Sequence, residues 1–303
     1  MSGLAFRLKE LRKSRKISQK ILAGELGVAQ TTIANYEQGT RFPDERVLHM
    51  LADYFGVTMD YLLGRNDVIN VSRDSQLTAG VNYEYSKEDM KFLARHYMEL
   101  VLSGDKQTAN SLIMNEIKKG IKIEDLYLHV FEHALKQIGA LWESGQLDVA
   151  SEHYFSNFTI TVMNQLYSYL NNQTRYPYNV ILVSVNGELH NIGLRMVSDL
   201  LEMAGFKTYF LGSNLPTQSI IKTLEEKHAG ILAVSATMDY HVNAVRDLIT
   251  AVKREEGCRE VKIMVGGAPF NLDRSLWKEV GADGYSSSAE EAVTVAKNLL
   301  GVG

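Results

Sequence analysis

One histidine in a favourable place is the first candidate for chemistry in this chain of 303 residues. His190 lies in the segment Glu188-Leu189-His190-Asn191-Ile192-Gly193, between an apolar run that predicts a strand over 179–185 and a pattern that predicts a helix over 192–204. Parallel sheets bind ligands at the carboxyl ends of their strands. Glu188 can hold one imidazole nitrogen and leave the other for a metal. A lone histidine here more often caps the next helix, so both interpretations stand at this point.

The pattern after residue 178 is that of a parallel sheet with helices on both faces. Apolar strands alternate with amphipathic helices, which is typical of a doubly wound, Rossmann-like or flavodoxin-like α/β domain at residues 174–303. The predicted strands are 179–185, 207–211, 230–235 and 261–265, and the predicted helices are 192–204, 217–227, 240–255 and 289–300. Ser235, Thr237, Gly266 and Gly267 follow two of these strands, so we expect them beside His190. The Gly-x-Gly-x-x-Gly turn of dinucleotide sites is absent.

Residues 87–173 read as a four-helix bundle. Helices are predicted over 87–103, 106–119, 123–143 and 147–171, with short connections between them. Trp142 and the pair Glu152-His153 lie on either side of the last connection and can face a common cavity. A packed tryptophan with two surface polar groups explains that spacing equally well.

The first 66 residues predict an all-α helix-turn-helix head, and residues 67–86 predict a linker. The head holds ten Lys or Arg against seven Asp or Glu, in a chain of net charge −4. A basic head on an acidic body favours a nucleic-acid-binding module. Gln30, Thr31 and Asn35 lie on the exposed side of the third helix, where side chains read bases in the major groove. A small helical protein-interaction domain is the alternative.

Composition excludes several classes of protein. No run of about 18 apolar residues predicts a membrane span, and the N-terminus has no apolar signal-peptide core. Cys258 is the one cysteine, which excludes an intramolecular disulfide. We therefore expect a reduced, cytoplasmic protein.

Four motifs occur in order in the head: Ile17-Ser18-Gln19, Leu26-Gly27-Val28, Gln30-Thr31-Thr32-Ile33 and Tyr36-Glu37-Gln38-Gly39. Together they resemble the lambda-repressor/Cro (XRE) family over about residues 5–64. The resemblance implies dimeric binding to double-stranded DNA. It implies phosphate contacts from Gln19, Gln38 and Arg41 and base contacts from Gln30, Thr31 and Asn35.

The loop motifs carry a second resemblance. Glu188-x-His190-x-x-Gly193, Ser235-x-Thr237 and Gly266-Gly267 resemble the corrinoid-binding domains of methionine synthase, mutases and their regulatory relatives, with Glu for the usual Asp and Thr for the usual Leu. The resemblance implies that His190 is the lower axial ligand of cobalt in a bound cobalamin. Ser235, Gly266 and Gly267 would form small walls around the displaced base and its nucleotide tail.

Trp-x9-Glu-His in the predicted bundle resembles the cap of the CarH-type adenosylcobalamin photoreceptor repressors. By that resemblance Trp142 packs over the adenosyl group, Glu152 bonds the ribose hydroxyls and His153 lies nearby. Glu143 stands where those photoreceptors have a histidine, which leaves light sensing and the upper cobalt ligand open.

These features lead to one predicted function. We expect a cobalamin-binding transcriptional regulator that is not an enzyme: an adenosylcobalamin-dependent, light-responsive repressor, dimeric or tetrameric, bound to a DNA operator and not to a membrane. A light-independent cobalamin sensor is the first alternative. A corrinoid methyl-carrier component of an enzyme is the second, although Cys258 stands alone and no substrate domain accompanies the site. A repressor with another small ligand is the third.

Overall fold

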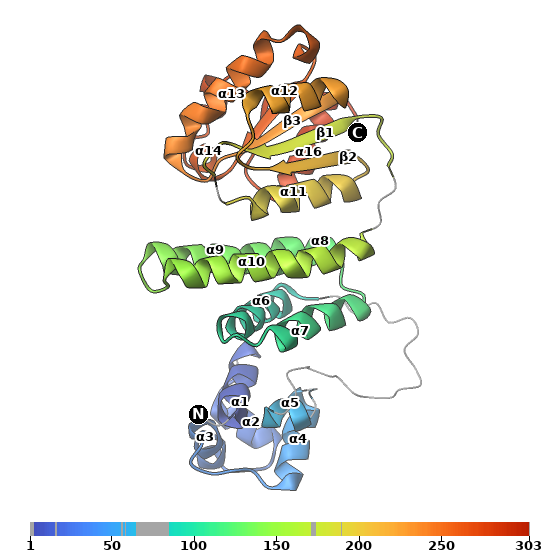
Figure 1. Cartoon of the computed structure of the whole chain (residues 1–303). Helices are drawn as coiled ribbons and strands as arrows, with labels where there is room; N and C mark the ends of the chain where they lie inside the picture. The colour runs from blue at the N-terminus through green and yellow to red at the C-terminus, as the bar shows by residue number, and fades with distance from the viewer. Residues whose placement is uncertain are drawn as a thin grey trace. The chain divides into compact units, whose positions relative to one another are not determined.

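A computed structural model describes residues 3–15, 17–55, 57, 59–64, 85–170, 174–188 and 190–302. The chain divides into two compact units, Met1–Ile121 and Lys122–Gly303, and Figure 1 labels many of their helices and strands. Of the predicted linker 67–86, residues 67–84 lie outside the described residues.

The first unit begins with the helix-turn-helix head. Its helices are α1 (Gly3–Ser14), α2 (Gln19–Glu25), α3 (Gln30–Gln38), α4 (Glu45–Phe55) and α5 (Met59–Leu63). Ser18 caps α2, because its side chain accepts a hydrogen bond from the Ile21 amide at 3.2 Å. Fully buried Leu22 and Ile33 hold α2 and α3 to one core. The helix-turn-helix expected from the sequence is therefore present.

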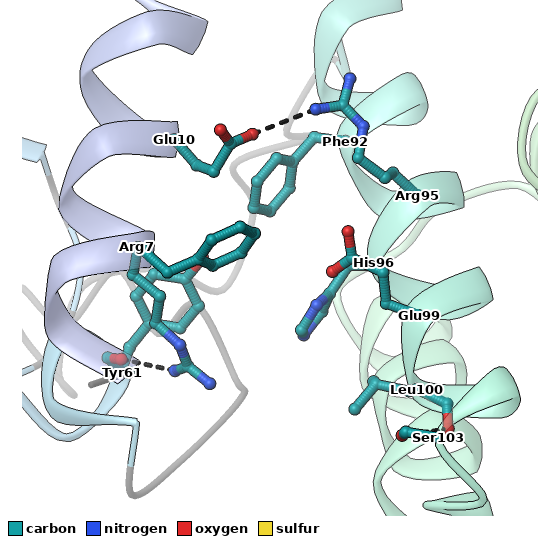
Figure 2. A pocket seen from close by; sticks show the side chains of 11 residues that line it. Arg7, Glu10, Tyr61, Phe92, Arg95, His96, Glu99, Leu100 and Ser103 are labelled. Atoms are coloured by element: carbon teal, nitrogen blue, oxygen red, sulfur yellow. Dashed lines mark hydrogen bonds and ion pairs between the residues drawn. The ribbon is translucent and has the colours of Figure 1, made fainter. Parts of the chain in front are cut away.

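Helices α6 (Lys87–Leu102) and α7 (Lys106–Lys118) complete the first unit. A hollow of about 370 Å³ lies between α1, α5 and α6 (Figure 2). At its rim Arg95 of α6 pairs with Glu10 of α1 at 3.1 Å, and Arg7 donates to the carbonyl oxygen of Tyr61. The head thus contacts α6 through charged as well as aromatic side chains.

The second unit begins with one continuous helical run over 123–143. It consists of α8 (Ile123–Asp125), a π-helical stretch η1 (Leu126–Phe131) and α9 (Glu132–Glu143). α10 (Val149–Leu166) and a short 3₁₀ turn η2 (Tyr167–Tyr169) follow. The predicted helix 147–171 thus ends earlier than expected. The predicted four-helix bundle would join helices from both units and stays a prediction.

The sheet of the second unit has five parallel strands in the order β2-β1-β3-β4-β5. They are β1 (Asn179–Ser184), β2 (Lys207–Gly212), β3 (Ala229–Ser235), β4 (Lys262–Gly266) and β5 (Gly284–Ser286). This is the flavodoxin-like order, so the predicted α/β class is confirmed. The sequence did not predict β5, because Gly284-Tyr285-Ser286 is short and has no apolar run.

Helices cover both faces of the sheet (Figure 1). α12 (Thr217–Glu226) and α13 (Val242–Arg254) pack on the face that carries Ile181 and Val183 of β1. α11 (Ile192–Met203) and α16 (Ala289–Leu300) pack on the face of Val180 and Leu182. Short helices η3 (Asp239–His241), η4 (Glu256–Cys258), α14 (Ala268–Leu272) and α15 (Leu276–Glu279) lie in the connections. In the described part of the chain no helix has the length and apolarity to cross a membrane.

A buried carboxylate ties the head's first three helices together. Glu37 of α3 is 5% exposed and accepts hydrogen bonds from the Arg12 guanidinium (2.9 Å from Nη2) and from the Gln19 amide at 2.8 Å. Burial by itself would raise the pKa of Glu37, but the bonds from Arg12 and Gln19 outweigh it and lower that pKa. A lowered folded-state pKa means that ionised Glu37 stabilises the head above the unfolded pKa. That stability is lost as the pH falls through the folded value.

We predict that Glu37→Gln lowers the local stability of the head by roughly 2 kcal/mol at pH 7, because the Gln amide group presents a donor to the donors of Arg12 and Gln19. The difference from wild type should shrink as the pH falls through the lowered folded-state pKa of Glu37, where the carboxylate protonates. Hydrogen–deuterium exchange of residues 19–38 measures it. Glu25→Gln, at an exposed position of α2, is the control. Equal exchange rates in the Glu37 variant and wild type would show that the Arg12–Glu37 pair adds nothing to the stability of the head.

Candidate functional site

The loop after β1 is built around the buried carboxylate of Glu188. Its side chain is 0% exposed and accepts four N–H groups. Oε1 takes the backbone amide and Nδ1 of His190, both at 2.8 Å. Oε2 takes the Thr237 amide at 2.7 Å and His241 Nδ1 at 3.0 Å. The loops after β1 and β3, on the two sides of the point where the strand order reverses, are thus joined through one carboxylate.

The charge of Glu188 is stabilised by these bonds. Burial, the largest single effect, would raise the pKa of the Glu188 carboxyl, but the bonds from His190, Thr237 and His241 together bring it to about 2. The bond to Glu188 in turn raises the pKa of His190, with a smaller contribution from Glu152. Because Nδ1 is held by Glu188, Nε2 is the ring nitrogen available to a metal. The His190 side chain is 34% exposed, which leaves room for a ligand.

His190 lines a cavity of about 330 Å³ at the carboxyl edge of the sheet. Its floor comes from the ends of β3 and β4, its side from α11, and its outer wall from α9 and the segment that joins β5 to α16. Of the residues predicted from the sequence, those that line it are His190, Gly193, Ser235, Thr237, Gly266 and Gly267. The fold thus brings these six residues together.

The two glycines after β4 allow a close approach of backbones. A Cβ on Gly267 would lie 1.9 Å from the carbonyl oxygen of Ala236, and the backbone there has a φ of 111°. A Cβ on Gly266 would lie 3.2 Å from the carbonyl oxygen of Ser286. Only glycine fits at 267, so this position secures the β3–β4 contact beside the cavity as well as a wall without side-chain bulk.

The predicted cap residues Trp142, Glu152 and His153 are not among the described residues that line this cavity, although Glu152 lies close enough to His190 to raise its pKa. Trp142 is half-buried near the end of α9, and Glu152 and His153 occupy the first turn of α10. The Glu152 carboxylate accepts from Ser156 Oγ at 2.7 Å and pairs with His153 Nδ1. Among the described residues that line the cavity, the helical wall is instead Glu132, Leu135 and Lys136 of α9. A role for Trp142, Glu152 and His153 at a cofactor stays a prediction.

Several site residues escaped the sequence analysis. His241 shares Glu188 with His190, and a histidine after the third predicted strand was the available signal. Asn271 and Ser286–Ala289 line the cavity from segments around the unpredicted β5. Nothing in the periodicity of the sequence distinguished them.

The predicted DNA-contacting residues are placed on the surface of the head. Gln30, Thr31, Gln38 and Arg41 are exposed, whereas Asn35 is half-buried. Gln19, predicted to touch a phosphate, donates its amide to Glu37, so part of its donor capacity is already used. Their contacts with DNA remain predictions.

Three family models match this chain. A helix-turn-helix domain matches residues 6–68, and two B12 binding domain models match residues 93–167 and 178–294. Among solved structures, the Methanosarcina barkeri monomethylamine corrinoid protein aligns with a TM-score of 0.61 at 22% identity over 69% of this chain and 98% of that one, a likeness of fold.

Two relatives align over most of their own length. Dimethylamine corrinoid protein 2 of Methanosarcina acetivorans is 34% identical over 170 residues, 55% of this chain and 77% of the relative. Dimethylamine corrinoid protein 3 of the same organism is 30% identical over 215 residues, 70% and 99% respectively. The fold and the matched models define a B12-binding protein with a helix-turn-helix domain. The chain belongs to the corrinoid protein family that includes these two relatives.

This finding corrects two predictions. The chain was expected to be a transcriptional regulator and not an enzyme, but the aligned relatives are named for a corrinoid and for dimethylamine. These names point to a corrinoid that takes part in a reaction of methylated amines, so both predictions are wrong. The error has a physical source: a DNA-binding motif and a cobalt ligand determine what a chain binds, not what the bound corrinoid does.

We predict that Gly267→Ala destabilises the second unit by roughly 3 kcal/mol, because the new methyl group meets the Ala236 carbonyl in a strained backbone. Gly139→Ala on α9, where a Cβ meets nothing within 4 Å, should instead stabilise by up to about 1 kcal/mol. Urea unfolding followed by tryptophan fluorescence reports this unit, since Trp142 and Trp277 both lie in it. Equal midpoints for the two variants would contradict the close approach.

Proposed function

We propose that this protein is a methyl carrier, the corrinoid-bearing component of a methyl-transfer system for methylated amines. In this proposal His190 is the lower axial ligand of cobalt, and partner proteins deliver the methyl group and take it away. The observation that carries the proposal is the buried Glu188 carboxylate that holds His190 Nδ1 at 2.8 Å, in a chain whose relatives are dimethylamine corrinoid proteins.

The residues present fit a corrinoid. An imidazole whose Nδ1 is fixed by a carboxylate is a well-oriented, basic metal ligand through Nε2. Ser235, Gly266 and Gly267 offer a narrow path without large side chains at the ends of β3 and β4, which suits a displaced nucleotide tail. When bound, the corrinoid supplies a cobalt centre that accepts and donates a methyl group.

The chain's own residues orient and enclose the group. Glu188 fixes the tautomer of His190, and His241 fixes Glu188 from the β3 side. Glu132 and Lys136 of α9 stand at the outer wall of the cavity. Trp142, Glu152 and His153 would cover the upper ligand if the cap resemblance extends to function. The same resemblance predicts the adenosyl form of the corrinoid.

A second activity is proposed for the head. Its exposed Gln30 and Thr31 at the start of α3 favour binding of double-stranded DNA, with Asn35 beside them and Gln19, Gln38 and Arg41 toward phosphates. A homo-oligomer would present two heads to paired half-sites, and size-exclusion chromatography tests it.

We predict that Glu188→Gln weakens corrinoid binding about 10- to 100-fold, because the NH₂ group of the new amide must face the N–H donors of either His190 or Thr237. His190→Ala should abolish protein ligation of cobalt. The measurement is the electron paramagnetic resonance spectrum of bound cob(II)alamin in protein labelled with ¹⁵N-histidine, whose nitrogen splitting reports an imidazole ligand. His153→Ala is the matched control and should keep the wild-type spectrum. A splitting unaffected by the label would remove His190 from the cobalt.

Because a partner protein takes the methyl group away in this proposal, we predict that the chain loaded with methylcobalamin methylates a thiol when a thiol-binding methyltransferase partner is supplied, and that His190→Ala lowers that rate. Loading with isotopically labelled methylcobalamin and counting the methylated thiol measures the transfer. Exclusive retention of adenosylcobalamin, with no methyl transfer, would refute the carrier proposal and support the adenosyl form.

We predict that Gln30→Ala with Thr31→Ala lowers binding to duplexes selected by the wild-type chain from a random pool by about 1–3 kcal/mol per lost base contact. Fluorescence anisotropy at fixed salt measures the affinity. Glu25→Gln, on the neighbouring helix, serves as control. Unchanged selectivity in the double variant would exclude α3 as the reading helix.

A further inference from the structure

Helix α11 begins two residues after His190 and carries a polar stripe along its length. Arg195, Asp199 and Glu202 recur at helical spacing on this helix. Two tyrosines from the helical segment that precedes the sheet reach this stripe. Tyr127 of η1 donates its hydroxyl to Asp199 Oδ2 at 2.9 Å, and Tyr167 of η2 donates to Glu202 Oε1 at 2.9 Å.

The inner bond is buried and fully matched. Tyr127 is 0% and Asp199 1% exposed, and the second carboxylate oxygen of Asp199 accepts from Arg195 Nε at 2.9 Å. Burial raises the pKa of Asp199, while Arg195 and the Tyr127 bond act in the opposite direction. A buried carboxylate with a donor on each oxygen is costly to disturb, because the loss of either donor leaves an unsatisfied polar atom out of reach of water.

The outer bond is weaker. Tyr167 is 43% exposed, so water competes for its hydroxyl. The Arg195 guanidinium lies 5.9 Å from the centre of the Tyr167 ring and 5.7 Å from that of Phe210, which adds a modest cation–π attraction. The two tyrosines therefore form a clamp on α11, which consists of a strong hydrogen bond from Tyr127 and a weak one from Tyr167.

Tyr127 lies in the π-helical stretch η1. π-Helical turns are rare and gather at functional sites. A regular helix turns by about 100° per residue, so the eight positions from Tyr127 to Leu135 would leave their side chains about 80° apart. The wider turn of η1 removes part of that rotation. Tyr127 can then bond α11 while Leu135 and its neighbours on the same continuous helix line the cavity.

We infer that Tyr127 is a positioning residue of the corrinoid site: its bond to Asp199 fastens the helical run 123–143 to α11 and so sets the position of the α9 wall over the cavity. This inference rests on the proposed function only in taking the cavity as the place of the corrinoid. Breaking the bond releases α9 from the cavity while the sheet stays folded.

Hydrogen–deuterium exchange of the full chain without corrinoid tests the clamp directly. Tyr127→Phe removes only the hydroxyl and should speed exchange in residues 132–143 by about tenfold or more, with β1 and β3 unchanged. Tyr167→Phe, which removes the exposed hydrogen bond, should change the exchange rate of residues 132–143 less than about twofold. Val252→Ala, a buried position of α13 on the other face of the sheet, is a matched destabilising control and should leave 132–143 unaffected.

A second variant identifies the partner. Asp199→Asn keeps the shape but replaces the charged acceptor of the Tyr127 hydroxyl by a weaker, neutral one, so Tyr127→Phe should have a smaller effect in that background, which a double-mutant cycle measures. Uniform acceleration across the sheet, or additive effects of the two substitutions, would overturn the inference.

The corrinoid readout separates this inference from the proposed function. With hydroxocobalamin bound, Tyr127→Phe should speed its release into buffer by about tenfold while the His190-dependent spectrum is retained. Release at the wild-type rate from a chain with a loosened α9 would refute the positioning role. A chain that never takes up hydroxocobalamin refutes the proposed function, while the exchange experiment still decides the clamp.

Discussion

The site depends on one interaction, the buried Glu188 carboxylate with its four N–H donors. A carboxylate out of contact with water must be matched by donors, and these come from the loops after two different strands. His190 can therefore take one orientation only when the β3 loop, with Thr237 and His241, is also in place. The orientation of Nε2 of His190, the nitrogen that we propose binds cobalt, is in this way a property of the folded sheet edge and not of a local turn.

The same physical device recurs at the other side of His190. Glu188 holds the loop before α11, and Asp199 within α11 accepts bonds from Tyr127 and Arg195. Both carboxylates are almost completely buried, and both join segments distant in the chain. Together the two carboxylates hold the loop that carries His190 and the helix α11, and residues of both line the cavity. Gly267, which has no side chain, completes this arrangement, because the β3 and β4 loops meet there at a distance that no side chain allows.

A motif encodes what a chain binds more directly than what the bound group does. Glu188-x-His190-x-x-Gly193 specifies a ligand geometry, and that geometry serves a sensor and a carrier equally well. The basic head favoured a regulator, whereas relatives aligned over most of their length are corrinoid proteins named for dimethylamine. The difference between the two functions lies in what approaches the corrinoid, and one chain's residues do not state it.

Elements with a local signal could be predicted from the order of the residues. Apolar runs predict β1 and β3 because a central parallel strand is buried on both faces, and Glu188 is found with His190 because two residues separate them. Short β5, with no such run, was missed. Long-range contacts could be seen in the folded structure only. Glu188 bonds Thr237 and His241, 49 and 53 residues further along the chain, and Tyr127 bonds Asp199 across 72 residues. The folded structure also showed that Glu132, Leu135 and Lys136 of α9 line the cavity. These pairs carry no periodic signal, because their proximity arises only when the sheet order and the packing of the helices bring their backbones together.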